Sequence, residues 1–363
     1  MLIKLKKLNF LFLFIVLLLS IIGSGALYSA AGGNFDPWAK NHIIRIVVCF
    51  ILILCIALTD IKLFYRYSYL FFFISLIFLF LVEILGTFGL GAKRWIHLFG
   101  VSIQPSEIIK IALILALSKY YHDLRFDRIG RIRNLLFPIL FILIPFILII
   151  SQPDLGTSIM YFLLGTIIMF TAGVRIWKFL LGFLATVISF PFIWSTLKPY
   201  QQKRVLSFLN PESDPLGQGY QLIQSKIALG SGGISGKGFL QGTQSYLEYL
   251  PEKQTDFIFT LIGEEFGFIG TIFIILLFLI LIFICYFIYF RSNHIFGKLL
   301  SIGIAANLFL YVILNIYMVV GLLPVVGIPL PLLSYGGTAM LSVMISFGLL
   351  MNVSIHNNFK TYS

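Results

Sequence analysis

One carboxylate, Asp256, stands where a long polar stretch of the chain gives way to an apolar run that continues to residue 290. This run of 35 residues is too long for a single membrane span, so we expect its first turns to dip in and break near Gly263–Gly267. A carboxylate at such a mouth is partly removed from water, which makes it a better general base. The alternative is that Asp256 only caps a helix. Glu264 and Glu265 lie just beyond and could share the cavity.

Glu107 and Lys110 form a second candidate group, because a spacing of three residues places them on one helix face within ion-pairing distance. Ionisable groups inside a span usually face the interior of a helix bundle or a wet cavity. The two could form a structural ion pair, or they could line a polar cavity and order a substrate or a neighbouring acid. Pro105 and Ser106 suit a helix start, with Ser106 as the cap.

Two cations, Lys203 and Arg204, are predicted on an outer surface by the topology given below. Their charge and the fork geometry of the guanidinium group suit phosphate oxygens, although basic residues are also common near lipid head groups. Asp154, in the turn Ser151–Thr157, could simply cap the next helix. The glycine-rich stretch Gly230–Gly238 lacks the spacing of a phosphate-binding loop, so we reject that interpretation.

The composition excludes an ordinary soluble protein. Of the 363 residues, 59% are hydrophobic and 11% are charged, and the mean hydropathy is +1.00, so a bilayer must be the solvent. The net charge of +12 lies mainly in short loops between apolar runs, which indicates membrane orientation and not nucleic-acid binding. The three cysteines fall inside apolar runs and are expected to be packing residues, with no disulfide framework or metal cluster.

Apolar runs long enough to span a bilayer predict an all-α, multi-pass protein with about ten transmembrane helices in a single domain over 1–363. The predicted spans are 8–28, 42–60, 66–86, 106–121, 134–151, 155–173, 177–197, 266–290, 297–320 and 335–355. With the N-terminus inside, fifteen Lys and Arg residues lie in cytoplasmic segments and three in short outer loops. This positive-inside asymmetry places both termini in the cytoplasm, and the long connection 198–255, between the seventh and eighth helices, outside.

This topology brings four polar or Pro/Gly-rich segments to the extracytoplasmic side: 91–107, Ser151–Thr157, 198–256 and Gly321–Gly337. Nucleotide sugars are absent there, so a substrate must bring its own activated leaving group, and the membrane setting suggests a lipid-linked one. The connection 198–255 keeps apolar and aromatic residues, so it should fold as a cap over the site, with a short helix over Gly217–Gly230. Three prolines in Gly321–Gly337 predict a re-entrant or broken element beside the same site.

Stretches across nearly the whole chain resemble the SEDS family of peptidoglycan polymerases. Residues 230–244 are more similar to its elongation branch, RodA, than to its division branch, FtsW. The matching motifs are GAKRWI (91–96), QPSEIIK (104–110), QPDLGTS (152–158), the run from KRVLSF to LQGTQ (203–244), LPEKQTDFIF (250–259), GEEFGF (263–268) and GIPLPLLSYGG (327–337).

The resemblance implies a processive glycosyltransferase that polymerises lipid II, the undecaprenyl-pyrophosphate disaccharide-peptide, on the outer face of the bacterial cytoplasmic membrane during cell elongation. It implies that Asp256 is the essential acid, which deprotonates the 4-hydroxyl of the acceptor sugar. It also implies a class B penicillin-binding protein as the transpeptidase partner, together with other proteins of the elongation complex.

The residues expected to bind the substrate are Trp95, Arg94, Glu107, Lys110, Lys203, Arg204, Gln254 and Thr255. On the resemblance, Glu107 and Lys110 match the pair on the fourth helix, and Trp95 matches the functional tryptophan of the first large outer turn. Gln254 departs from the family, in which histidine is common at this position. We expect nearby cations to hold the pyrophosphate, and a divalent cation, Mg²⁺ or Mn²⁺, could share that task, although no ligand cluster demands one.

Two other functions fit part of this pattern. A transporter, either a flippase for the same precursor or an ion-coupled carrier, would use the intramembrane charges and proline-broken helices. It predicts polar residues along a path through the bilayer, whereas these residues cluster at one mouth. A non-catalytic scaffold for cell-wall enzymes would leave Asp256 replaceable.

Overall fold

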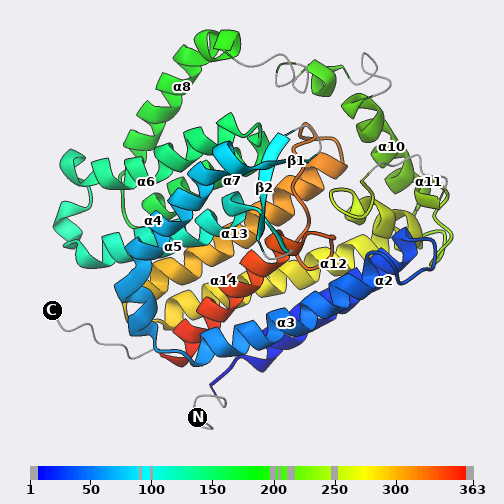
Figure 1. Ribbon diagram of the computed structural model, residues 1–363, viewed down its shortest axis with the longest axis horizontal. Coiled ribbons are helices and arrows are strands. Elements are labelled where there is room, and N and C mark those ends of the chain that lie inside the picture. The colour runs from blue at the N-terminus through cyan, green and yellow to red at the C-terminus, as the bar shows by residue number, and fades with distance from the viewer. Residues whose placement is uncertain are drawn as a thin grey trace.

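The computed structural model describes residues 7–89, 92–98, 101–196, 202, 206–210, 217–246 and 252–356 (Figure 1). Lys203 and Arg204 lie outside the described residues, so their expected contact with phosphate stays a prediction. The long helices of the described part are α2 (Phe10–Ala30), α3 (Ala39–Leu58), α4 (Ile61–Leu85), α5 (Pro105–Asp123), α6 (Ile132–Ser151), α7 (Leu155–Thr171), α8 (Ile176–Thr196), α12 (Ile258–Arg291), α13 (Ile295–Val319) and α14 (Gly337–Ile355).

Seven of these helices are long and apolar enough to cross a membrane: α2, α3, α4, α6, α12, α13 and α14. Helices α7 and α8 are apolar but contribute shorter apolar segments, and α5 carries charged residues. The protein is therefore mostly helical with at least seven candidate spans in its described part. The full count of ten, the orientation and the side of the long connection stay predictions.

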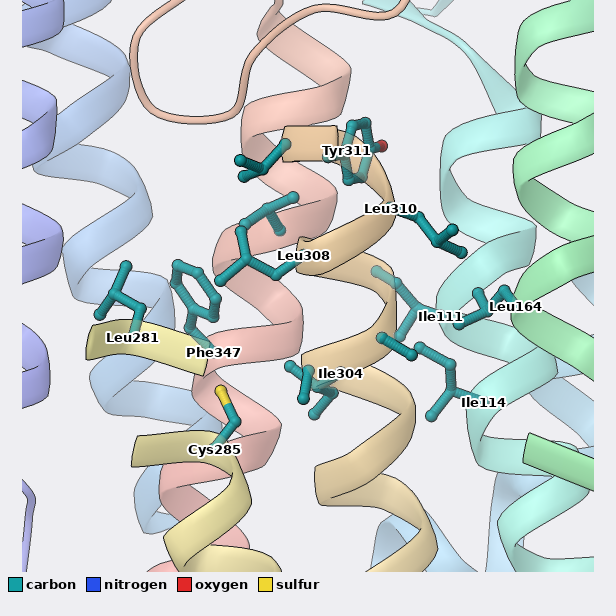
Figure 2. Packing of buried hydrophobic residues seen from close by; sticks show 14 of the residues in the cluster. Ile111, Ile114, Leu164, Leu281, Cys285, Ile304, Leu308, Leu310, Tyr311 and Phe347 are labelled. Atoms are coloured by element: carbon teal, nitrogen blue, oxygen red, sulfur yellow. The ribbon is translucent and has the colours of Figure 1, made fainter. Parts of the chain in front are cut away.

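Helices α5, α13 and α14 form the centre of the bundle. In α5 every residue from Ile109 to Ser118 is buried, and α13 and α14 are largely covered by their neighbours. Figure 2 shows Ile304 and Leu308 of α13 packed between Phe347 of α14 and the α5 side chains. The helix with ionisable groups thus lies farthest from lipid, where other protein groups can pair with them.

Peripheral helices expose large apolar side chains. Helix α8 is exposed along most of its described length and stands away from the bundle in Figure 1. Such a surface would be unfavourable in water, and it suits contact with lipid.

A small antiparallel sheet corrects the all-α expectation. Strands β1 (Thr87–Gly89), β2 (Ala92–Leu98) and β3 (Val101–Ile103) pair in the order β1-β2-β3 between α4 and α5. The backbone between two helices must find hydrogen-bond partners, and adjacent hairpins provide them locally. The sheet places Arg94 and Trp95 on β2, next to the start of α5.

The predicted break in the last long apolar run is confirmed. Gly267 has φ 64° and ψ −160°, so α12 kinks there. The backbone groups released by the kink bond to the glycine-rich stretch: Phe268 N–H donates to Gly233 O at 2.9 Å, and Lys237 N–H donates to Glu264 O at 3.0 Å. A Cβ on Gly236 would lie 2.1 Å from Glu265 O, so close approach of two backbones explains the glycines here.

The long connection contains two described helices, α10 (Gln218–Ser231) and α11 (Thr243–Tyr246). Helix α10 confirms the short helix predicted over Gly217–Gly230, and it packs on α12 and α13. Between α13 and α14 the chain is non-helical, as its prolines predicted. The second half of this segment is largely buried, with Leu330, Leu332 and Leu333 fully covered, whereas Leu322 near its start is exposed.

Candidate active site

Asp256 lies in the turn directly before α12, and its side chain is partly exposed. The side-chain amide of Asn315, on α13, donates to the carbonyl oxygens of Asp256 at 2.8 Å and Ile328 at 2.7 Å. A Cβ added to Gly327 would lie 3.5 Å from Oδ2 of Asp256, so the carboxylate sits close to the broken segment. The N-cap residue of α12 is Phe257, so Asp256 is not the cap that the simpler interpretation predicted.

The turn that carries Asp256 is held by a second backbone contact. Tyr335 N–H donates to Gln254 O at 2.8 Å, which ties the turn to the end of the broken segment. The Glu252 carboxylate accepts from the Thr255 hydroxyl at 3.1 Å and from the Gln254 amide at 3.4 Å. The side chains of Gln254 and Thr255 are therefore bonded within the turn beside Asp256, and their expected contact with substrate stays a prediction.

Arg94, on β2, contacts the turn before α7. Its guanidinium group donates to the carbonyl oxygens of Gln152, at 3.3 Å, and of Pro153, and lies 3.9 Å from the Asp154 carboxylate. Asp154 accepts from Thr157 N–H at 3.3 Å, which confirms it as the cap of α7. Arg94 thus positions the turn before α7, and its expected contact with substrate stays a prediction.

The start of α5 joins Asp154, the residue beside Arg94, to the start of α14. Gln104 donates through its amide to Asp154 at 3.0 Å and through its backbone N–H to the Thr338 hydroxyl at 3.3 Å. Gln104 is the N-cap residue and Pro105 begins the helix, which corrects the expectation that Ser106 is the cap. Proline suits this position because it lacks the N–H that the first turn would leave unpaired.

The four segments predicted to share one side meet here. Contacts join β2 to the turn before α7, α5 to α14, and the turn before α12 to the broken segment. Trp95, on β2, is partly exposed and pairs across the sheet with Thr87. Its expected role in binding substrate stays a prediction.

Glu107 and Lys110 form the expected ion pair, 2.8 Å apart. They belong to a closed cluster, because Tyr311 of α13 accepts from Lys110 at 2.5 Å and donates to Glu107, while the Ser342 hydroxyl of α14 donates to Glu107 at 3.2 Å. Only 3% of Glu107 and 1% of Lys110 is exposed. The pair contacts protein on all sides in this structure, so its expected contact with a substrate pyrophosphate stays a prediction.

Glu264 and Glu265 do not face the Asp256 turn through any described contact. Glu264 binds Lys237 at 2.7 Å and accepts from Gln244 N–H at 2.9 Å, which fastens the long connection to α12. Glu265 accepts from the Ser29 hydroxyl of α2. Both carboxylates thus hold elements together.

Several residues of the site escaped the sequence analysis. Asn315, Tyr311 and Ser342 lie inside apolar runs, where a polar side chain is itself a signal of buried hydrogen bonding. Arg45, on α3, lies 4.5 Å from the ring centre of Tyr335 and donates to its hydroxyl at 3.2 Å. Within the described ranges, no group of three or more His, Cys, Asp or Glu residues could hold a metal ion.

The fold and these polar contacts define a class of protein. It is a multi-pass membrane protein whose polar groups gather at one end of a helical bundle, around the partly exposed carboxylate of Asp256. The family of cell cycle proteins that comprises FtsW, RodA and SpoVE matches residues 4–359. The chain belongs to this family, and with its apolar helices it is a multi-pass protein of the inner membrane.

Named relatives cover almost the full length of the chain. Peptidoglycan glycosyltransferase MrdB of Escherichia coli K12 is 38% identical over 353 residues, covering 97% of this chain and 94% of that protein. Stage V sporulation protein E of Bacillus subtilis is 37% identical, with 97% and 98% covered.

Solved structures share the fold. A chain from a structure titled as the coordination of polymerization and crosslinking by a peptidoglycan synthase complex matches with a TM-score of 0.84 and 29% identity, over 97% of this chain and 99% of that chain. The rod shape determining protein RodA of Thermus thermophilus matches with a TM-score of 0.74 at 22% identity, over 97% and 98%.

Proposed function

We propose that this chain is a peptidoglycan glycosyltransferase that polymerises lipid II at the outer face of the membrane, with Asp256 as the general base. The observation that carries the proposal is the partly exposed carboxylate of Asp256 in a turn that Asn315 and Tyr335 hold through the backbone. A base must be fixed in position and still be reachable by its substrate. The names of the relatives supply the reaction class.

In the proposed step, the Asp256 carboxylate accepts the proton of the acceptor sugar 4-hydroxyl. The oxygen then attacks the anomeric carbon of the donor, and the bond from that carbon to the pyrophosphate oxygen breaks. The electron pair leaves with the undecaprenyl pyrophosphate, whose negative charge Lys203 and Arg204 would stabilise. Asp256 leaves the step protonated and returns its proton to water.

The topology proposed for this reaction has ten spans and cytoplasmic termini, with the 198–255 connection as an outer cap within one domain. The docking of α10 on α12 and the bond between Lys237 and Glu264 support a folded cap. The proposed partner is a class B penicillin-binding protein within the elongation complex. The similarity to a chain of a peptidoglycan synthase complex supports a shared assembly.

The test is a polymerisation assay on the purified full-length protein with labelled lipid II, with and without a class B penicillin-binding protein. We expect glycan polymer, and we expect Asp256→Asn to reduce its rate by about 10²- to 10⁴-fold, the usual contribution of a general base. Asp36→Asn is the matched control, since Asp36 is exposed and, within the described residues, forms an ion pair with the exposed Lys40.

Size-exclusion elution and thermal unfolding should be unchanged in Asp256→Asn, because Asn315 holds this residue through its backbone carbonyl, which the substitution keeps. Polymer formed at the normal rate by Asp256→Asn would refute the assignment of the base. No polymer from the unaltered protein in either assay, together with movement of lipid II across vesicle membranes, would favour a flippase.

A further inference from the structure

A cavity of about 320 Å³ lies at the far end of α12 from Asp256. Three elements meet there: the start of α2, the last turn of α12 and the last turn of α14. Its polar lining comes from Lys7, Asn9, Arg291 and Ser354, and Phe287 and Val353 contribute apolar walls. Neither the proposed reaction nor the Glu107–Lys110 pair uses this cavity.

Among the described residues, the lining carries positive charge and no carboxylate side chain. Lys7 and Arg291 both line the cavity, and neither forms an ion pair with another described residue. Arg291 lies over the ring of Phe287, with its guanidinium carbon 4.5 Å from the ring centre, which holds the charge beside the cavity.

The helix ends add unequal contributions to the local potential. Helix α2 begins at this cavity, with Asn9 as its cap and the positive end of its dipole beside Lys7. Helices α12 and α14 end there, and their terminal carbonyl groups oppose an anion. Arg291 lies in the last turn of α12, and its charge offsets the negative end of that helix dipole. The two side-chain cations, Lys7 and Arg291, therefore make the local potential positive.

The cavity lies at a boundary of the bilayer. It opens where the candidate spans α2, α12 and α14 begin or end, the level at which lipid head groups lie. Next to it, Phe10 and Phe14 on α2 are 64% and 61% exposed, and Phe283 and Phe290 on α12 are 67% and 63% exposed. Helices α2 and α12 are in contact, and both helices that form this α2–α12 seam carry exposed rings that hydrocarbon chains can cover.

We propose that this cavity binds an anionic phospholipid, with the head-group phosphate between Lys7 and Arg291 and the acyl chains along the α2–α12 seam. A basic pocket between helix ends at the membrane surface suits such a head group, because charge and acyl burial act together. A soluble phosphate would use the same two cations but would gain nothing from the apolar seam. The site is independent of the proposed glycosyl transfer.

The test is native mass spectrometry of the full-length protein in detergent, titrated with phosphatidylglycerol, with phosphatidylcholine of the same acyl chains, or with inorganic phosphate. We expect retention of phosphatidylglycerol over the zwitterionic lipid. Each lost cation should weaken retention about fivefold, and Lys7→Gln with Arg291→Gln on the order of 25-fold. Arg133→Gln is the matched control, since Arg133 is an exposed arginine at the first turn of α6, away from this cavity.

Arg291→Lys keeps the charge and should retain the lipid, which separates loss of binding from loss of folding. Equal retention of both lipids, or equal loss in Arg133→Gln, would overturn the proposal. Inorganic phosphate that displaces phosphatidylglycerol at equal concentration would also overturn it and would identify a soluble anion as the ligand.

Discussion

The two ionic regions of this molecule, the Glu107–Lys110 pair and Asp256, hold their charges in opposite ways. The Glu107–Lys110 pair is sealed between α5, α13 and α14, and each charge meets a partner side chain from another helix. Asp256 instead lies partly exposed in a turn, where Asn315 donates to its backbone carbonyl. The buried arrangement is suited to fixing how helices pack, and the partly exposed one to a carboxylate that a substrate can reach.

This difference follows from the cost of burying charge. A fully buried ion needs its counterion and its hydrogen bonds, so it has little freedom to act on a substrate. A partly exposed carboxylate can be reached by a substrate, as a general base must be. Substitutions at the two regions should therefore separate loss of stability from loss of activity.

The largest loss of stability is expected for Lys110→Met, which leaves the Glu107 carboxylate buried without its counterion. Breaking a buried pair in this way costs about 3–5 kcal/mol. Thermal unfolding in matched detergent measures the change. The double substitution Glu107→Gln with Lys110→Met should restore much of the loss, because no charge is then left unpaired. Equal unfolding temperatures for the single and double variants would show that the pair is not what holds α5 to its neighbours.

An intermediate effect is expected for Asn315→Leu, which removes the donor to two carbonyl groups, those of Asp256 and Ile328. Each buried acceptor left without a partner costs about 1–3 kcal/mol. The turn should also lose its position, so the polymerisation rate should fall by more than the loss of folded protein explains. Asn307→Leu, on the same helix and also buried, loses no side-chain hydrogen bond to another described residue and should change both quantities less. A larger effect at Asn307 would contradict this account of the Asp256 turn.

The smallest effect is expected for Tyr335→Phe, which removes one hydroxyl and leaves the ring under Arg45. The loss should be about 1 kcal/mol or less, the net value of one hydrogen bond. Arg45→Gln removes the hydrogen bond and the cation–π contact together and should cost more. Unfolding temperatures of the two variants test the order, and the reverse order would show that the Tyr335 hydroxyl has another partner.

Sequence reasoning predicted the elements better than their contacts. The break near Gly267, the Asp154 cap and the Glu107–Lys110 ion pair all follow from spacing within a few residues, and the structure confirms them. The sheet over 87–103 was missed because two of its three strands have only three residues, too few for a periodic signal, and the seven-residue β2 has no long partner strand. The helix start at Gln104 was missed because the residues that Gln104 bonds to, Asp154 and Thr338, lie far along the chain.

The sequence by itself determined that this protein resides in a bilayer and where its apolar runs begin and end, since the length and polarity of a run are local properties. It also determined the one pairing that spacing along a helix dictates, Glu107 with Lys110. Only the tertiary structure decided that Tyr311 and Ser342 close around that pair and that Asn315 holds the Asp256 turn. These contacts join residues 59 to 235 positions apart, and only the packing of helices against one another sets such distances.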